Sequence, residues 1–178
     1  MLFRSIGRLS LQKNVHVLIN AVAAVGNATP WRLTVIGAGA ELERLKAQVR
    51  RIGVADRVTF TGALPHLQAM RRCAEAEIFV QPSSSEGWAK ALGEAMTFGL
   101  ACVASDRGTM AQMLAEGRGV IVPAGDAAAL ADALRRLCAD PALRRDMGKR
   151  ARAFALDQTL ESAVERTVRE VGAHFRLP

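Results

Sequence analysis

The chain of 178 residues is 50% hydrophobic and 23% charged, which is the balance of a globular protein with a buried core. No apolar run approaches the roughly 20 residues of a membrane-spanning helix, and the charged N-terminal segment is too short for a secretory signal peptide. The net charge of +7 favours anionic partners, but the basic C-terminal third has no interleaved aromatic residues, so we expect no nucleic-acid partner. We expect a cytoplasmic protein, and its basic charge leaves a peripheral contact with the inner face of the membrane open.

The three cysteines, Cys73, Cys102 and Cys138, lie far apart in the sequence and form no Cys-x-x-Cys pair. Their odd number argues against a disulfide framework, and with only three scattered histidines we expect no metal site. Cys102 lies in an apolar run, which indicates a position in the core.

Short apolar runs alternate with longer amphipathic segments along the first two thirds of the chain. The pattern predicts strands over 2–7, 31–37, 58–61, 78–81, 101–105 and 119–122, and helices over 15–28, 41–52, 66–74, 90–98 and 110–114. After Pro123 the pattern is helical only, over 127–138, 141–156 and 160–175, with Asp126 as a cap and Pro141 at a helix start.

This alternation predicts the α/β class: a doubly wound, Rossmann-like parallel six-stranded sheet with helices on both faces and extra C-terminal helices. We find no linker, internal repeat or low-complexity segment, so residues 1–178 are expected to form a single domain.

In an open parallel sheet, ligands bind at the carboxyl ends of the strands, so the turns after the strands are the places to look for a site. The turn after the first strand contains Arg8 and Lys13, which follow Gly7. An arginine fork and a lysine point charge at one crevice would form a clamp for a diphosphate. Two loop cations in contact with water are the alternative interpretation.

The turn after the second strand contains Gly37 and Gly39, which resemble the opening of a dinucleotide-binding fingerprint. The fingerprint is incomplete, because Leu42 stands at the third glycine position, and it would belong after the first strand of such a fold. We therefore interpret these glycines as a tight turn and expect no binding of NAD.

The turn after the fourth predicted strand carries two carboxylates. Glu86 lies in the loop, Gly87 permits a close approach of the backbone to a ligand, and the following helix offers free N–H groups to a phosphate. Glu94 lies on an apolar stretch of that helix and needs a partner there. The hydroxyls of a sugar or ribose would suit it, and pairing with an arginine or a backbone cap is the alternative.

Several motifs in a fixed order carry a family resemblance. They are Gly7-Arg8-Leu9 with Lys13, Gly37 with Gly39, Arg57-Val58-Thr59-Phe60-Thr61-Gly62, Pro82-Ser83 with Glu86-Gly87-Trp88, Glu94-Ala95-Met96-Thr97-Phe98-Gly99, Val103-Ala104-Ser105-Asp106, and Gly125-Asp126 with Leu130-Ala131. Over essentially its whole length, the chain resembles the C-terminal, donor-binding domain of a GT-B glycosyltransferase of the retaining family 4, also called glycosyl transferases group 1.

The resemblance implies transfer of a sugar from a UDP-, GDP- or ADP-linked donor to an acceptor hydroxyl, with retention and without a metal or other cofactor. Arg8 and Lys13 would bind the diphosphate and stabilise the leaving nucleotide, while Glu86 would hold sugar hydroxyls and Glu94 the ribose. The resemblance further implies that donor contacts come from Gly7, from the main chain of Ala63 and Leu64, and from the backbone of Gly87, Trp88, Ala89, Lys90 and Ala91.

The sequence departs from the family pattern at several positions that contact the donor sugar. Ala89 replaces the second loop glycine, Lys90 follows it, and Gln112 stands where the family has a glutamate. The family's N-terminal acceptor domain does not fit before Gly7, so we expect that domain to be absent from residues 1–178. It would then be a partner of this domain, in cis or in trans. The alternatives are a nucleotide-sugar-binding module without transfer activity and a sugar-nucleotide epimerase of the same fold; a glycoside hydrolase would leave the phosphate clamp unexplained.

Overall fold

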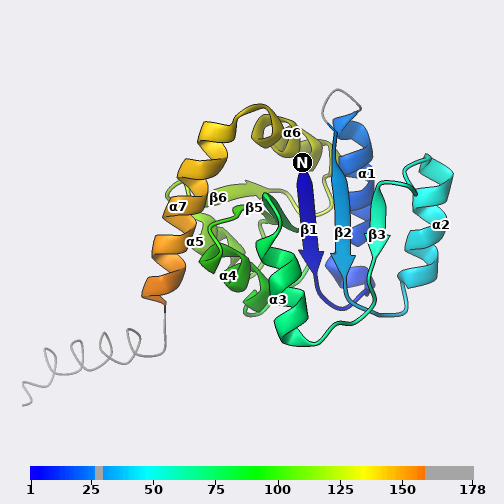
Figure 1. Cartoon of the computed structure of the whole chain (residues 1–178), viewed down its shortest axis with the longest axis horizontal. Coiled ribbons are helices and arrows are strands. Elements are labelled where there is room, and N and C mark those ends of the chain that lie inside the picture. The colour runs from blue at the N-terminus through cyan, green and yellow to red at the C-terminus, as the bar shows by residue number, and fades with distance from the viewer. Residues whose placement is uncertain (27–29, 159–178) are drawn as a thin grey trace, which may run out of the picture.

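Six parallel strands form the central sheet of the computed structural model, which describes residues 1–26 and 30–158 (Figure 1). The strands are β1 (Leu2–Ile6), β2 (Arg32–Ile36), β3 (Val58–Phe60), β4 (Ile78–Gln81), β5 (Ala101–Ser105) and β6 (Gly119–Val122). Their order across the sheet is β3-β2-β1-β4-β5-β6, and every neighbouring pair is parallel. The predicted fold class is confirmed.

The helices follow the predicted order with small differences at their ends. They are the 3-10 helix η1 (Leu11–Lys13) and the α-helices α1 (Val15–Val25), α2 (Leu42–Ile52), α3 (His66–Ala74), α4 (Lys90–Thr97), α5 (Met110–Leu114), α6 (Ala127–Ala139) and α7 (Pro141–Asp157). Helix α1 ends before the predicted residue 28, because Gly26 adopts a positive φ of 86° that stops the helix. The predicted helix over 160–175 lies outside the described residues.

The two capping predictions for the C-terminal helices are confirmed. The Asp126 side chain accepts a hydrogen bond from the Ala129 amide at 2.9 Å and so caps α6. Pro141 occupies the first turn of α7, where its missing N–H leaves no helical hydrogen bond unmade.

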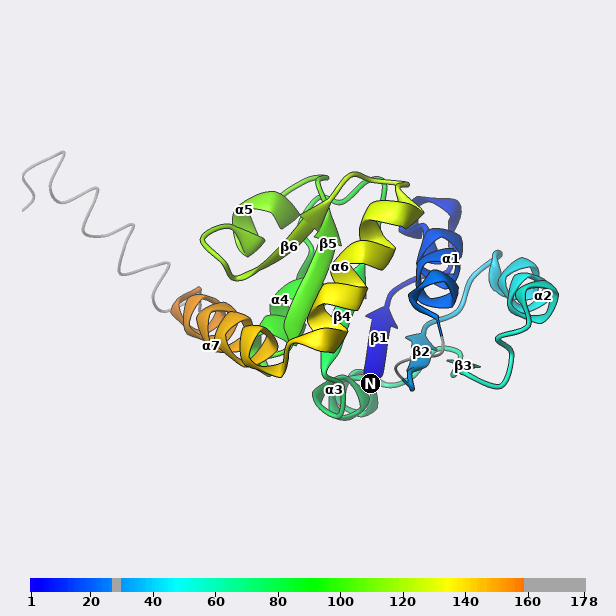
Figure 2. The same cartoon turned by 90° about the horizontal axis from the view of Figure 1, so that it is seen from above.

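Helices cover both faces of the sheet and enclose two clusters of buried apolar side chains (Figures 1 and 2). Helices α1, α2 and α6 pack on one face, where Leu18 and Leu134 are fully buried. Helices α3, α4, α5 and α7 pack on the other, where Leu92 and Met96 are fully buried. Because both faces are covered, the central strands carry near-continuous apolar runs, and all four residues of β4 are buried.

The strand order reverses between β1 and β4, and this reversal decides where a ligand can bind. From β1 the chain proceeds outward to β2 and β3, whereas from β4 it proceeds the other way to β5 and β6. The connections after β1 and β4 therefore diverge to opposite faces of the sheet and leave a crevice between them at the carboxyl ends of the strands. The loops that contain Arg8, Lys13 and Glu86 border this crevice.

Candidate functional site

The loop after β1 holds a lysine in place and exposes an arginine. The chain turns through η1 to Asn14, which adopts a left-handed conformation with φ 48° before α1 begins. The Lys13 stem passes over Gly7, where an added Cβ would lie 3.5 Å from Lys13 Cε. Arg8 is exposed, and its guanidinium has no hydrogen-bond or ion-pair partner among the residues that the structure describes.

The glycine pair after β2 supports this loop by close packing. A Cβ at Gly37 would lie 1.9 Å from the Gly7 carbonyl oxygen, and one at Gly39 would lie 2.2 Å from that of Leu9. The Leu9 amide in turn donates to the Ala38 carbonyl at 2.9 Å. The expected tight turn therefore has a specific role, because only glycine lets the two loops approach this closely.

The loop after β4 is tied to its neighbours on both sides. The Ser84 amide donates to the Gln12 carbonyl of η1 at 2.7 Å, and the Ser105 hydroxyl at the end of β5 donates to the Ser83 carbonyl. A Cβ at Gly108, which has φ 58°, would lie 2.0 Å from the Glu86 carbonyl oxygen. The segment after β5 therefore packs directly over the backbone that carries Glu86.

Glu86 is the best-held side chain of the crevice. Its Oε1 accepts hydrogen bonds from Lys13 Nζ, from Gln81 Nε2 at 2.7 Å and from Ser83 Oγ at 2.8 Å. Burial alone would raise the pKa of Glu86, but the hydrogen bonds from Lys13, Ser83 and Gln81 outweigh burial and lower that pKa below its ordinary value. Its Oε2 accepts no hydrogen bond within the described part of the chain, so the site holds an ionised carboxylate with one oxygen fixed and one available.

Gln81 and Ser83 are functional residues that the sequence interpretation missed. A carboxylate can only accept, so the Gln81 amide nitrogen must face Glu86, which leaves the buried Gln81 Oε1 without a partner among the described residues. An unsatisfied buried acceptor costs about 1–3 kcal/mol, which this site tolerates in order to hold Glu86. A polar residue at the end of the otherwise apolar β4 is the sequence feature that marks Gln81.

Glu94 lies one turn into α4 and has a lysine and a histidine as neighbours. Its Oε1 lies 3.4 Å from Lys90 Nζ and 3.6 Å from His66 Nε2, and its side chain is about one fifth exposed. Glu94 is thus paired, with Lys90 and His66 rather than with the arginine or backbone cap that the sequence left open, and both partners are exposed. His66, at the start of α3, is a further site residue that the sequence interpretation missed.

Two cavities border these side chains. One, of about 380 Å³, gathers Gly7, Arg8, Ala63, Leu64 and Glu94 from three separate segments. The other, of about 240 Å³, is lined by Trp88, Lys90 and Glu94 together with residues of α5 and α7. Glu94 therefore stands between the two cavities, and most of the predicted donor-contact residues meet around it.

The start of α4 offers main-chain groups rather than side chains. Ala89, the residue before α4, is buried in the core, Ala91 is half-buried, and neither has a functional group in its side chain. No side chain caps α4; the Lys90 and Leu92 amides donate to the carbonyls of Trp88 and Ala89, and the Ala91 amide has no acceptor among the described residues. The predicted roles of Gly87, Ala89 and Ala91 can thus be played only by their backbone.

Neither a metal cluster nor a membrane-spanning helix occurs in the described ranges. No three His, Cys, Asp or Glu side chains gather there in a way that could hold a metal ion. No helix within residues 1–26 and 30–158 is long and apolar enough to cross a membrane.

Two bacterial glycosyltransferases are similar in sequence to most of the chain. The lipopolysaccharide core biosynthesis mannosyltransferase LpcC of Rhizobium leguminosarum bv. viciae is 32% identical over 176 residues, covering 95% of this chain and 49% of that protein. The GDP-mannose-dependent alpha-(1-6)-phosphatidylinositol monomannoside mannosyltransferase of Mycolicibacterium smegmatis is 30% identical over 161 residues, covering 85% of this chain and 42% of that protein. The chain thus spans about half the length of these relatives or less.

Solved structures of similar proteins have the same fold. Anabaena HepE in complex with UDP superimposes with a TM-score of 0.84 at 22% identity, covering 97% of this chain and 48% of HepE. Sucrose-phosphate synthase of Thermosynechococcus elongatus superimposes with a TM-score of 0.85 at 28% identity, covering 98% of this chain and 45% of that protein. The family model described as glycosyl transferases group 1 matches residues 2–154, and the chain therefore belongs to this family.

Proposed function

We propose that the chain is the donor-binding domain of a retaining glycosyltransferase of family 4, which transfers a sugar from a nucleoside diphosphate sugar to an acceptor hydroxyl. The observation that carries the proposal is the crevice at the strand reversal, where Lys13 holds Glu86 and the exposed Arg8 lies close by without a partner among the described residues. A phosphate group is the natural counterion for such an arginine. HepE, whose fold is the same, was crystallised with UDP and with UDP-glucose, which supports this choice of ligand.

In this proposal each group of the crevice has one role. Arg8 and the uncapped start of α4 bind the diphosphate, and Lys13 adds the positive charge that stabilises the leaving nucleotide. Glu86 accepts hydroxyls of the transferred sugar through its available Oε2, because its Oε1 is held by Lys13, Gln81 and Ser83. Glu94 accepts the ribose hydroxyls, and the main chain of Ala63 and Leu64 borders the base. No cofactor takes part.

In this proposal, sugar transfer requires this domain together with an acceptor-binding domain. The relatives that match here are about twice as long as the chain, and a GT-B enzyme binds its acceptor between two halves. The alternative is a binding module that holds the nucleotide sugar without transferring it. An assay of donor turnover by the 178-residue chain separates the two ideas: turnover by the chain alone would contradict the need for a second domain.

Calorimetric titration with UDP, GDP and ADP tests the donor site. We expect one of them to bind, and both Arg8→Ala and Lys13→Ala to weaken that binding about tenfold or more, because a charge-assisted hydrogen bond contributes about 1.5–3 kcal/mol. Arg145→Ala is the matched control. It removes an arginine from α7, outside the donor crevice, and should leave the affinity unchanged. Absence of binding by all three nucleotides would contradict the proposed site.

A further inference from the structure

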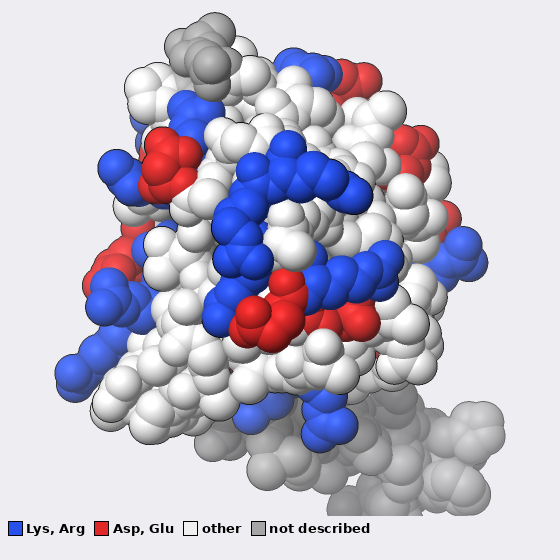
Figure 3. Space-filling model, turned by 90° about the vertical axis from the view of Figure 1, so that its right-hand side faces the viewer, with Lys and Arg blue, Asp and Glu red and all other residues white. Residues whose placement is uncertain are grey.

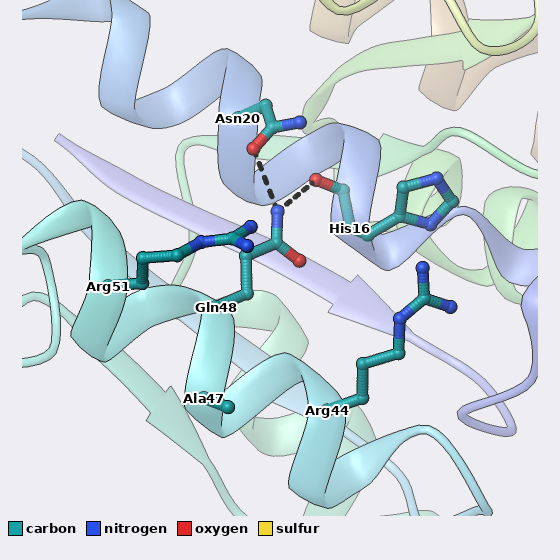
Figure 4. A pocket seen from close by; sticks show the side chains of 6 residues that line it. All are labelled: His16, Asn20, Arg44, Ala47, Gln48 and Arg51. Carbon is teal, nitrogen blue, oxygen red and sulfur yellow. Dashed lines mark hydrogen bonds between the residues drawn. The ribbon is translucent and has the colours of Figure 1, made fainter.

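A third cavity lies between α1 and α2 and shares no residue with the donor site. Its volume is about 320 Å³, and its lining consists of His16 and Asn20 from α1 and of Arg44, Ala47, Gln48 and Arg51 from α2 (Figure 4). Neither the crevice around Glu86 nor the two cavities beside Glu94 includes any of these residues. The glycosyl transfer proposed above gives this cavity no role. We call it the α1–α2 groove.

The rim of the α1–α2 groove is basic. Arg44 and Arg51 lie two turns apart on the same face of α2, and Lys and Arg side chains gather on this side of the molecule (Figure 3). Arg44 is paired with an acidic side chain, since its guanidinium donates to Glu41 Oε2 at 2.8 Å. Arg51 has no ion-pair or hydrogen-bond partner in the part of the chain that the structure describes, so it brings an uncompensated charge to the groove.

The floor of the groove is a fixed pair of carboxamides. Gln48 is only 8% exposed, and its Nε2 donates to the His16 carbonyl at 2.9 Å and to Asn20 Oδ1 at 2.8 Å. Because Asn20 Oδ1 accepts from Gln48, the Asn20 amide nitrogen is left as the outward donor (Figure 4). The groove therefore presents hydrogen-bond donors from both helices in an arrangement that is set before any ligand arrives.

The His16 ring is partly buried and lies beside a cationic side chain of the groove. Its pKa is lowered first by burial and then by the nearby Arg44, while Glu41 opposes the shift. In Figure 4 the Arg44 side chain extends toward this ring, and Arg51 extends toward Gln48. Arg44 is also paired with Glu41, whereas Arg51 has no acidic partner among the described residues, so Arg51 is the cationic group of the groove that is available to an anion.

We propose that the α1–α2 groove is a binding site for the phosphate group of a small molecule, held by Arg44, Arg51 and Asn20. Guanidinium forks match phosphate oxygens in geometry and charge, and about 320 Å³ lies at the small end of the range for small-molecule sites. His16 follows Lys13 by three residues, and the Glu41 amide at the start of α2 donates to the Leu9 carbonyl at 3.1 Å. The site therefore adjoins the loop that carries Arg8 and Lys13 without sharing their side chains.

Titration of the 178-residue chain with inorganic phosphate and with pyrophosphate tests the proposal. Nuclear magnetic resonance of the side-chain amides locates the anion, because the signals of Asn20 and Gln48 lie in the groove. We expect both signals to shift with a saturable dependence on concentration, and Arg51→Ala to weaken that dependence about tenfold. Arg50→Ala is the matched control: it removes the neighbouring arginine of α2, which does not line the groove, and should leave the dependence within about twofold of the parent.

Three outcomes would contradict the proposed phosphate site in the α1–α2 groove. Equal effects of Arg50→Ala and Arg51→Ala would identify a diffuse basic surface instead of a site. Loss of the Asn20 and Gln48 shifts in Arg8→Ala would place the anion in the donor crevice. Flotation of the chain with vesicles that contain phosphatidylglycerol, without any response to the free anions, would identify a membrane surface. The groove titration depends on no donor-site residue, so failure of the proposed transferase function leaves this test intact.

Discussion

At the residue scale, the ionised state of Glu86 is the feature on which the crevice depends. Three donors converge on one of its oxygens: Gln81 at the end of β4 and Ser83 in the following loop are close to Glu86 in sequence, whereas Lys13 comes from the loop after β1. The Glu86 carboxylate therefore links the loop after β1 to the loop after β4, in addition to its proposed role in binding the sugar. Its contribution to stability should be visible in the dependence of unfolding on pH.

Glu86→Gln should remove a part of the stability that depends on pH. The hydrogen bonds lower the pKa of Glu86 in the folded protein below its ordinary 4.5, so the ionised carboxylate stabilises the fold above that pH. This stability is lost as the pH falls through the lowered pKa. Urea unfolding should therefore show the variant less stable than the parent at pH 6, and the difference should shrink toward pH 3.

The control for this prediction is Glu43→Gln. Glu43 also has a pKa lowered by a hydrogen bond from Lys46, but it lies fully exposed on α2 and contributes little to folding. Its removal should change the free energy of unfolding little at either pH. A difference between Glu86→Gln and the parent that stayed constant from pH 6 to pH 3 would contradict a stabilising charge at Glu86.

At the scale of elements, the sequence allowed the strands and helices to be predicted well, because each buried strand is a short apolar run between amphipathic helices. The pair Lys13 and Glu86 could be assigned to one site from motifs and from the rule that parallel strands share a ligand-binding edge. Gln81 and His66 could not. The bond from Gln81 to Glu86 depends on the path of the loop after β4, and the role of His66 depends on α3 starting beside α4; hydrophobic periodicity carries no information on either.

Close approach of α7 to the end of α4 gives a prediction at this scale. A Cβ at Gly148 in α7 would lie 2.0 Å from the Gly99 carbonyl oxygen, just beyond α4, so Gly148→Ala must push the two elements apart. We expect the variant to lose about 1–3 kcal/mol of unfolding free energy, measured by urea denaturation.

Gly93→Ala is the matched control within α4. Its nearest neighbour would be the flexible end of Met113 at 3.5 Å, an ordinary contact, so the gain in helix propensity should raise stability by up to about 1 kcal/mol. Equal stabilisation by both substitutions would show that α7 does not approach α4 closely in solution.

At the scale of the whole molecule, one sheet separates two apolar clusters, and the single domain expected from the sequence stays a prediction. Trp31 lies in the cluster beneath α1 and α6, fully buried and covered by the Arg57 guanidinium at 4.4 Å from its ring. Trp88, the other tryptophan, is exposed beside α4. In a Trp88→Phe background, fluorescence therefore reports on one cluster alone, while circular dichroism reports on the whole fold.

Leu92→Ala, made in the Trp88→Phe background, opens a cavity in the opposite cluster and tests whether the two clusters unfold together. The side chain is fully buried in α4, so its truncation should cost about 2–5 kcal/mol and lower the Tm by about 4–20 °C. If strands β1 and β4 couple the two faces, the transition followed by Trp31 fluorescence and the transition followed by circular dichroism will shift to the same lower Tm. Leu67→Ala, on the exposed side of α3, should shift neither. A Trp31 transition that stayed at the parent temperature while the circular dichroism became biphasic would show that the two clusters, on opposite faces of the sheet, unfold independently.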